Sequence, residues 1–370
     1  MCLTSVIWMI VFSKRIIYTR DYSSHMVDQN ESAEDIWTKD EDLTRIIEDR
    51  NFRIKVFGFG GSGSNTINRL MRENLVGVKL IACNTDAAHL LRIRAHAKIL
   101  LGKNLTRGLG AGADPTVGEM AAKESESEIL RHIDETSIVF ITAGFGGGTG
   151  TGAAPYVAKL AKDRGALTIA FATLPFSSEG YVRMKNAAEG IRKLVKNSDA
   201  AIVIPNDKLI EKYNDVPVYK AFKFEDEVIS TGIKGITDLI MNTGTINLDF
   251  NDLRKVMKDA GYAAIGMGSS NQAVNDRIVE ALEKALDSPF MDYDISRAKG
   301  AIVNVTGGRD LQLQEAQQAA DMLRKKIARD ATIMWGTVID ENMRSGVRIL
   351  IIVAGIKPNF KLDQDLEEVR

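Results

Sequence analysis

A dense run of glycine and threonine is the first feature of this 370-residue chain that could do chemistry. The nine residues from Gly144 to Gly152 contain six glycines, together with Thr149 and Thr151. Glycine weakens helices and strands, so this density has a reason only where the backbone turns tightly or is approached closely. Bare backbone N–H groups and hydroxyls suit phosphate oxygens, so the run predicts a phosphate-binding loop.

Two more glycine-rich loops occur at GFGGSG (58–63) and GLGAGADP (108–115). The first fits the G-x-G-x-x-G motif of dinucleotide-binding folds, and Asp86 lies near the position of the acid that binds the ribose in such folds. An NAD-dependent dehydrogenase is therefore one alternative. This first loop is not a P-loop, because no Lys-Ser/Thr pair closes it. A dinucleotide fold needs one glycine turn at its pyrophosphate, whereas three such loops favour a nucleoside triphosphate.

The elements that must position these loops alternate between strands and helices. Apolar, strand-like runs at 52–59, 78–86, 137–145, 166–176 and 200–207 alternate with helical patterns at 64–74, 118–133, 153–165 and 180–198. The alternation predicts a doubly wound α/β fold with a parallel sheet. Such sheets bind ligands at the carboxyl ends of their strands, where the glycine loops are expected.

A long helix is expected from about Glu225 to Met241, and the order of elements changes after it. The later pattern predicts strands at 262–270, 300–308, 331–340 and 347–356, with helices at about 274–287 and 313–329. We therefore expect a second α/β domain with a four-stranded sheet.

Composition excludes several classes of function. The 48 basic and 49 acidic residues leave a net charge of −1, so no basic field favours nucleic acid as a partner. The two cysteines and four histidines form no metal-binding pattern, so we expect a reducing, cytoplasmic setting.

The amino terminus permits two interpretations. The apolar run 5–12 is too short for a transmembrane segment, which leaves a weak membrane-surface anchor or, our preferred interpretation, a tail that precedes a true start at Met26. Residues 1–51 are expected to be a flexible extension.

The chain resembles the FtsZ family of the tubulin superfamily from about Phe52 to Ile356. The resemblance rests on seven motifs in order: GGSGSN (60–65), NTD (84–86), GAGADP (110–115), GGGTGTGAAP (146–155), PFSSEGYVRM (175–184), IPND (204–207) and NLDFND (247–252). It implies an archaeal or bacterial GTPase, with an archaeal source expected. It also implies a GTP-binding domain at 52–224, a central helix at 225–246, a GTPase-activating domain at 247–356 and a tail at 357–370.

The same resemblance implies a binding site for GTP or GDP. Its phosphate contacts would be Gly60, Gly61, Ser62, Gly63, Ala111, Gly112, Ala113, Gly146, Gly147, Gly148, Thr149, Gly150, Thr151 and Gly152. Asn65 would reach toward the base, and Asn206 would lie near the sugar.

Four further residues would complete the pocket. Glu179 would bind the ribose hydroxyls and Arg183 would lie against the ribose or base, although the two could equally be an exposed i,i+4 pair. Phe222 would stack on guanine, or else be a core aromatic residue. Asp226 would accept the two N–H donors that guanine offers and adenine lacks, and the neighbouring Glu227 leaves the register open by one residue.

The catalytic residues implied by the resemblance are Asn247, Asp249 and Asp252. If these residues have only structural roles, Asn251 or Asp252 would be the N-cap of a helix, and Asp249 would be a solvated acid in a loop. The helix from 225 to 241 would extend about 25 Å, so these acids cannot reach the nucleotide at its other end. In the family they act on the nucleotide of the next subunit in a head-to-tail filament.

Several partners follow from the resemblance. Mg²⁺, with K⁺ as a further cation, would accompany GTP without protein side chains as metal ligands. The main partner would be the chain itself, together with membrane-anchoring and regulatory division proteins. The expected location is the mid-cell division ring on the cytoplasmic face of the membrane. A tubulin-like GTPase that serves cell shape is the nearest alternative.

Overall fold

The structure is a computed structural model that describes residues 53–73, 75–134, 136–208, 218–241, 249–271 and 276–359, with the side chains of 218–225 excepted. These residues lie in one compact unit, Asp49–Arg370. The expectations for 1–51 and for residues beyond 359 fall outside the described part. Every helix within that part is too short or too polar to cross a bilayer.

The first half of the chain is the expected parallel sheet. Its strands follow the order β6–β5–β4–β1–β2–β3, and each pairs in parallel with its neighbours. Their bounds are β1 Ile54–Phe59, β2 Val78–Asn84, β3 Ala97–Leu100, β4 Ile138–Gly144, β5 Leu167–Leu174 and β6 Ala200–Pro205. Strand β3 was not predicted, because its four residues carry too little pattern.

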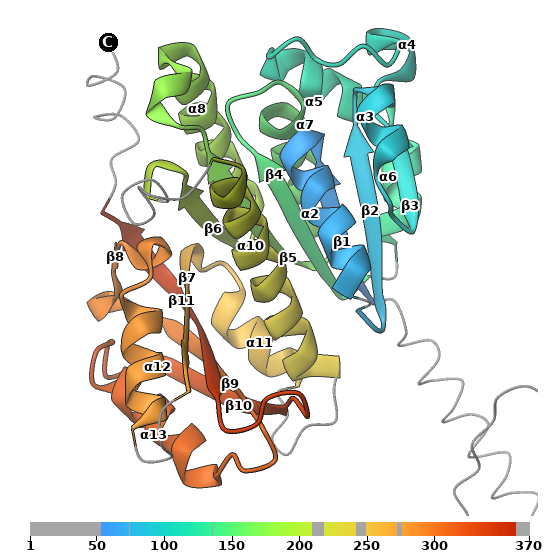
Figure 1. Cartoon of the computed structure of the whole chain (residues 1–370). Coiled ribbons are helices and arrows are strands. Elements are labelled where there is room, and N and C mark those ends of the chain that lie inside the picture. Colours follow the sequence, from blue (N-terminus) through green and yellow to red (C-terminus); the bar gives the residue numbers. More distant parts are fainter. Residues whose placement is uncertain are drawn as a thin grey trace, which may run out of the picture. The chain divides into compact units, whose positions relative to one another are not determined.

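Helices cover both faces of this sheet (Figure 1). Strand β1 shows the reason, because Ile54 and Val56 belong to one core whereas Phe57 and Phe59 belong to the other. The first core includes α2 and α10, and the second includes α5, α6, α7 and α8. The helices are α2 Gly60–Glu73, α3 Ala87–Arg92, α4 Lys103–Thr106, α5 Pro115–Glu124, α6 Glu126–Ile133, α7 Thr149–Asp163 and α8 Tyr181–Asn197, with the 3-10 helix η1 Ser177–Glu179.

The second half supplies the four expected strands. Strand β11 pairs antiparallel with β7 and β9, and β9 pairs in parallel with β10. The elements are α11 Phe250–Met257, β7 Gly261–Ser270, α12 Arg277–Leu286, η2 Pro289–Met291, β8 Tyr293–Asp294, η3 Ile295–Arg297, β9 Gly300–Gly307, α13 Leu313–Arg324, β10 Thr332–Ile339 and β11 Val347–Pro358. Strand β11 therefore continues into residues 357 and 358, which had been assigned to the tail.

The two halves share one sheet, which the sequence did not predict. Strand β7 pairs in parallel with β6 from Ala200↔Gly261 to Ile202↔Ala263. Backbone hydrogen bonds therefore join the four later strands to one edge of the first half.

Helix α10, Val218–Met241, runs between the two halves (Figure 1). It begins seven residues before Glu225, where the sequence analysis placed its start. Two glycines let it approach the later strands closely. A Cβ on Gly232 would lie 2.4 Å from Ile265 Cδ1, and one on Gly235 would lie 2.2 Å from Leu350 Cδ2.

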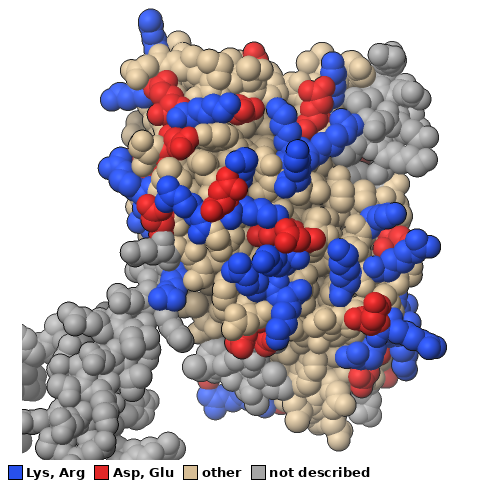
Figure 2. Space-filling view, turned by 180° about the vertical axis from the view of Figure 1, so that it is seen from behind, with Lys and Arg blue, Asp and Glu red and all other residues tan. Residues whose placement is uncertain are grey.

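Charged side chains of both signs are interspersed over the face seen in Figure 2, with basic ones in the majority. Ion pairs within the chain neutralise part of this charge, as between Lys159 and Asp163 or Arg164 and Asp134.

A buried guanidinium holds together the loops of the second half. Arg277 at the start of α12 is fully buried and lies 2.6 Å from Glu315 Oε1 and 2.7 Å from Asp310 Oδ2. It also donates to the carbonyl oxygen of Ser345 at 2.7 Å. One side chain therefore links α12, the start of α13 and the loop before β11.

We expect Arg277→Ala to lower the free energy of unfolding by about 3–5 kcal/mol, because it leaves the carboxylate of Glu315 buried without its cation. Urea denaturation measures the change. Arg309→Ala is the matched control, because Arg309 forms an exposed ion pair with Glu341 in the same region. Equal stability of the two variants would contradict the prediction.

Candidate functional site

The three glycine-rich loops meet at the carboxyl ends of the parallel strands. A Cβ on Gly144 would lie 2.9 Å from Ser62 Cβ, and a Cβ on Gly148 would lie 2.7 Å from Ala111 Cβ. The third loop is tied to the end of β2, because Gly110 N donates to Thr85 O at 3.1 Å. The hydroxyls of Thr85 and Thr149 are 2.7 Å apart. The structure therefore brings together the loops that the sequence singled out.

Most glycines in these loops are required by packing. A Cβ on Gly63 would lie 2.2 Å from Thr142 O, one on Gly150 would lie 2.3 Å from Gly144 O, and one on Gly152 would lie 2.0 Å from Pro115 O. These contacts are with backbone atoms, which cannot rotate away. Tight packing against strand β4, within one loop and between two loops explains these three glycines without a ligand.

Four other glycines face open space. No atom of the described residues would lie within 4 Å of a Cβ on Gly61, Gly110, Gly112 or Gly147. Gly110 and Gly112 have φ of 91° and 58°, which favour glycine in any case. Gly61 and Gly147 have neither a positive φ nor a close neighbour. The fold gives no reason for glycine at these two positions, whereas an approaching ligand would.

The amino ends of α2, α5 and α7 lie at these loops. Helices α2 and α7 have no acidic residue in their first turn, so their free N–H groups and positive dipole ends favour an anion at the loops. Helix α5 begins with Pro115 and is capped by Asp114, which accepts a hydrogen bond from Thr116 N at 2.8 Å, so it offers fewer free N–H groups.

Some polar groups of the loops form hydrogen bonds within the loops, whereas others are exposed. Thr151 is buried, and its Oγ1 accepts a hydrogen bond from Gly146 N at 2.9 Å, so it shapes the loop. Asn65 is exposed, and Ala113 lies in the left-handed region at φ 62°. Asn186 of α8, which no sequence pattern indicated, donates a hydrogen bond from its Nδ2 to Ala113 O at 3.2 Å.

Asp226 faces α2 and is the half-buried member of the Asp226–Glu227 pair. Thr66 Oγ1 donates to its Oδ1 at 3.1 Å. Burial raises the pKa of Asp226, although the Thr66 hydroxyl and the charge of Arg69 oppose the shift. Glu227 is exposed and lies 3.3 Å from Arg69. Phe222 lies one helical turn before Asp226 in α10, and its side chain is outside the described part.

Residues of the expected ribose end lie around η1 and the end of β6. Glu179 forms an ion pair with Arg183 and accepts a hydrogen bond from Phe176 N at 3.0 Å. Asn206 is 5% exposed, and its Oδ1 has no hydrogen-bond partner within the described residues. A buried acceptor without a donor is costly, so a ligand donor would stabilise it. Ser177 Oγ donates to Asp207 at 2.6 Å, which holds η1 against β6.

The expected catalytic acids lie far from these loops. Asp249 is the N-cap of α11 and accepts a hydrogen bond from Asp252 N at 2.8 Å. The expectation of Asn251 or Asp252 as the cap is therefore wrong: the cap must precede the first helical residue, which is Phe250. Asp252 lies 3.2 Å from Lys255 Nζ. Asn247 lies outside the described residues.

Helix α10 separates the acids from the glycine loops. From Asp226 to Met241 it extends about 22 Å, and α11 follows beyond its carboxyl end (Figure 1). One copy of the chain therefore cannot place both groups on one nucleotide.

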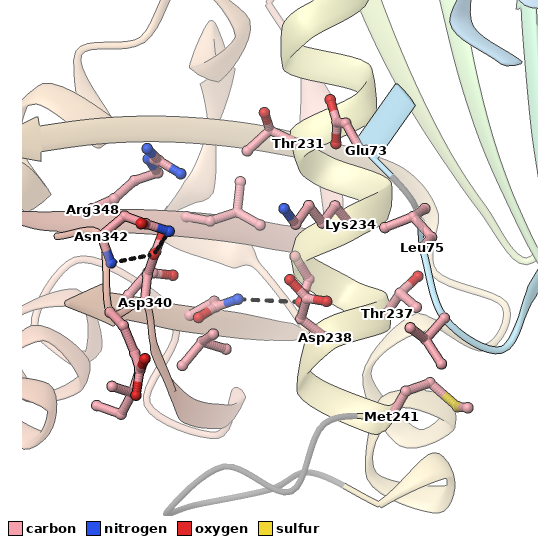
Figure 3. Close-up of a pocket in the computed structure, with 18 residues that line it drawn as sticks. Glu73, Leu75, Thr231, Lys234, Thr237, Asp238, Met241, Asp340, Asn342 and Arg348 are labelled. Atoms are coloured by element: carbon pink, nitrogen blue, oxygen red, sulfur yellow. Dashed lines mark hydrogen bonds between the residues drawn. The ribbon is translucent and has the colours of Figure 1, made fainter. Parts of the chain in front are cut away.

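A pocket of about 520 Å³ lies between the carboxyl half of α10 and strands β9, β10 and β11 (Figure 3). Lys234, Asp238 and Arg348 line it, together with Glu73 at the carboxyl end of α2. The glycine loops lie at the amino end of α2, so this pocket is not part of their site. Within the described ranges, no group of three or more His, Cys, Asp or Glu residues could hold a metal ion.

Asp86 has an ordinary structural role. It is the N-cap of α3, and its Oδ1 accepts a hydrogen bond from His89 N at 2.9 Å. This capping accounts for the acid that a dinucleotide interpretation would assign to a ribose.

Known proteins share this arrangement. Residues 53–214 match the GTPase domain of the Tubulin/FtsZ family, and residues 261–357 match the C-terminal domain of the FtsZ family. Cell division protein FtsZ 1 of Thermococcus kodakarensis is 51% identical over 89% of this chain and 87% of its own length. FtsZ 1 of Methanocaldococcus jannaschii is 47% identical over 87% of this chain and 88% of its own length.

Solved structures agree with the sequence relatives. A structure described as an empty FtsZ dimer from M. jannaschii has a TM-score of 0.80 and 48% identity over 86% of this chain and 92% of that chain. CetZ2 from Haloferax volcanii, at 20% identity, shares the fold with a TM-score of 0.74 over 86% of this chain and 97% of that chain. The dehydrogenase alternative is thereby set aside: the chain belongs to the FtsZ family of the tubulin superfamily and carries its GTPase domain.

Proposed function

We propose that this GTPase assembles head to tail into filaments that serve cell division, and that it hydrolyses GTP at the junction between two subunits. The separation of the glycine loops from Asp249 and Asp252 within one chain carries the proposal. A site divided between opposite ends of a molecule is completed when one copy stacks on the next. The M. jannaschii relative described as a dimer supports self-association.

The phosphates of GTP would bind where the three loops meet. The free N–H groups at the starts of α2 and α7 would donate to the phosphate oxygens and stabilise their negative charge. Gly61 and Gly147 would leave room for the phosphate oxygens, and Ser62 and Thr149 would add hydroxyl donors. Gly60, Gly63, Gly146, Gly148, Gly150, Thr151 and Gly152 would shape the cradle, and Ala111, Gly112 and Ala113 would close it near the terminal phosphate.

The base and ribose would lie between α2, α10 and η1. Asp226 would accept both guanine donors, with Phe222 stacked on the ring and Asn65 near the base. The two donors would stabilise the carboxylate that burial disfavours. Asn206 Oδ1 would accept a hydrogen bond from a sugar hydroxyl. Glu179 would give up part of its ion pair with Arg183 and accept hydrogen bonds from the ribose hydroxyls instead.

Hydrolysis would need the next subunit. Its Asp249 and Asp252, with Asn247, would approach the terminal phosphate and orient the attacking water. Loss of that phosphate would weaken the junction, so filaments would turn over.

Mg²⁺ would bind this site through the phosphates rather than through side chains. The ion usually keeps several waters and binds to substrate phosphates. Bound there, the ion would neutralise charge that develops on the phosphate oxygens, and K⁺ would act as a further cation.

The names of the relatives favour division over a role in cell shape. Division implies a cytoplasmic ring at mid-cell, with membrane-anchoring and regulatory proteins as partners and no nucleic acid. Depletion of the protein distinguishes the two roles, because a division protein leaves undivided filamentous cells and a shape protein leaves misshapen dividing ones.

Asp252→Ala should retain GTP binding and assembly but lose GTP turnover by about 100-fold, because the acid is absent from the neighbour's pocket. Phosphate release and sedimentation measure the two properties. The wild-type rate per subunit should rise steeply with protein concentration. A flat rate would contradict a shared site.

Mixing two variants tests the sharing directly. The Asp252→Ala variant keeps an intact nucleotide pocket. The Asp226→Asn variant keeps both hydrolytic acids, Asp249 and Asp252. In an equimolar mixture roughly a quarter of the junctions should unite the two intact halves and recover activity. A mixture no more active than its components would disprove the divided site.

Asp226→Asn should weaken GTP binding roughly 10- to 100-fold, because it removes a charged acceptor.

The raised pKa of Asp226 means that the nucleotide-free protein loses stability as pH rises above the ordinary Asp range toward that pKa. The variant should therefore melt at an equal or higher temperature at pH 7. Nucleotide titration and thermal melts measure both effects, with Glu227→Gln as the control for the alternative register.

Gly61→Ala should leave the stability of the nucleotide-free protein unchanged, because open space surrounds the new methyl group. Its GTP affinity should fall roughly tenfold or more, because the methyl group occupies phosphate space. Gly63→Ala should instead lose about 1–3 kcal/mol of stability, because its Cβ meets Thr142 O. Unchanged GTP affinity in Gly61→Ala would show that no ligand approaches this position.

A further inference from the structure

A polar cluster outside the nucleotide site holds the carboxyl end of α11, the helix that Asp249 caps at its amino end. Asp259 follows this helix directly after its C-cap, Lys258. Its Oδ1 lies 2.6 Å from Nζ of Lys162, near the carboxyl end of α7. The contact therefore joins the second half of the chain to the GTP-binding half.

Lys162 is itself anchored to a buried group. Its Nζ lies 3.3 Å from Asp199 Oδ1 and donates to Ser198 O at 3.1 Å. Asp199 is 4% exposed, and its Oδ2 accepts a hydrogen bond from Thr168 N at 2.9 Å. The ammonium group thus has a fixed position on the GTP-binding half.

The electrostatics of the cluster agree with this geometry. Burial would lower the pKa of Lys162, but its hydrogen bonds and charge contacts with Asp259 and Asp199 outweigh burial and raise that pKa. The hydrogen bond from Lys162 lowers the pKa of Asp259. Both groups are therefore held in their charged forms.

The backbone of Asp259 has a conformation that glycine adopts most readily and that Asp tolerates. Its φ of 49° lies in the left-handed region, where the residue after a helix is usually glycine. Glycine would satisfy the backbone alone, but only an acidic side chain can pair with Lys162. A second contact supports the same placement, because Arg254 Nη1 of α11 donates to Gly165 O at 3.5 Å.

Apolar packing and the ion pair have different effects on α11. Leu253, Val256 and Met257 bury one face of the helix in the core. Such packing is non-directional, whereas a hydrogen-bonded ion pair at the helix end opposes sliding and rotation.

We propose that Lys162 is a positioning residue for GTP hydrolysis: through Asp259 it fixes α11, and with it Asp249 and Asp252, against the GTP-binding half. This inference rests on the proposed function, because α11 matters for turnover only if its acids act on the next subunit. Lys162 would not touch the nucleotide.

The main test compares Lys162→Met with Lys159→Met in the full chain. Lys159 lies on the same helix and pairs 2.7 Å from Asp163, but that pair does not involve α11. Lys162→Met should lower GTP turnover per polymerised subunit about threefold to tenfold at saturating GTP, because small misplacements of catalytic groups slow reactions. GTP affinity should match that of Lys159→Met, whereas the melting temperature should be lower, because Lys162→Met leaves the buried carboxylate of Asp199 without its cation.

Three further variants separate positioning from a loss of structure. Lys162→Arg should recover most of the turnover. Asp259→Asn leaves a side chain of the same size that also tolerates left-handed backbone, but it removes the negative charge. Its GTP turnover should therefore fall as much as that of Lys162→Met. Asp259→Gly should melt at an equal or higher temperature, because glycine relieves the positive φ, and yet turn over slowly. The double variant of Lys162→Met and Asp259→Asn should be no slower than either single variant.

The inference is wrong if Lys162→Met turns over GTP as fast as Lys159→Met. It is also wrong if the loss of turnover is accompanied by an equal loss of GTP affinity, or if Asp259→Asn, which keeps the Lys162–Asp199 contact, turns over GTP at the wild-type rate. If Asp252→Ala retains turnover, the proposed function fails. If Asp252→Ala loses turnover but Lys162→Met does not, only the role of Lys162 fails.

Discussion

The rigidity and length of α10 are the constraint on which the chemistry of this chain depends. A helix of 24 residues extends about 36 Å and cannot bend back on a nucleotide bound near its start. Its first half lies beside α2, where Asp226 meets Thr66, and its second half packs on the later strands. The helix therefore keeps the glycine loops apart from Asp249 and Asp252 within one copy, which is why we propose that turnover depends on assembly.

Close backbone contact is the second constraint, and it explains why one region of the chain needs so many glycines. The loops must first pack on each other, as Gly63 does on Thr142 and Gly152 on Pro115. Only then do the starts of three helices share one space. A few glycines, Gly61 and Gly147 among them, are left to admit a ligand. Most of the glycine signature thus builds the loops, and only a small part of it faces open space that a ligand could enter.

Polar groups show the same division between structure and function. Buried Arg277 satisfies its hydrogen bonds with its own chain and stabilises the second half. Asp226 and Asn206 are less well satisfied, the first with a raised pKa and the second with a free Oδ1 within the described residues. Groups that the fold leaves partly unsatisfied are those that a ligand can stabilise.

Local patterns in the chain were enough to predict the parallel sheet, the four later strands and the three loops. Periodicity and glycine spacing report on neighbouring residues, and parallel strands place their loops at a common edge. The junction of β6 with β7, the start of α10 at Val218 and the cap at Asp249 escaped prediction. So did the contacts of Asn186 with Ala113 and of Lys162 with Asp259, which join residues far apart in the chain. Such contacts depend on how the folded helices and strands pack against one another. A local sequence pattern carries no information about residues that lie far away in the chain.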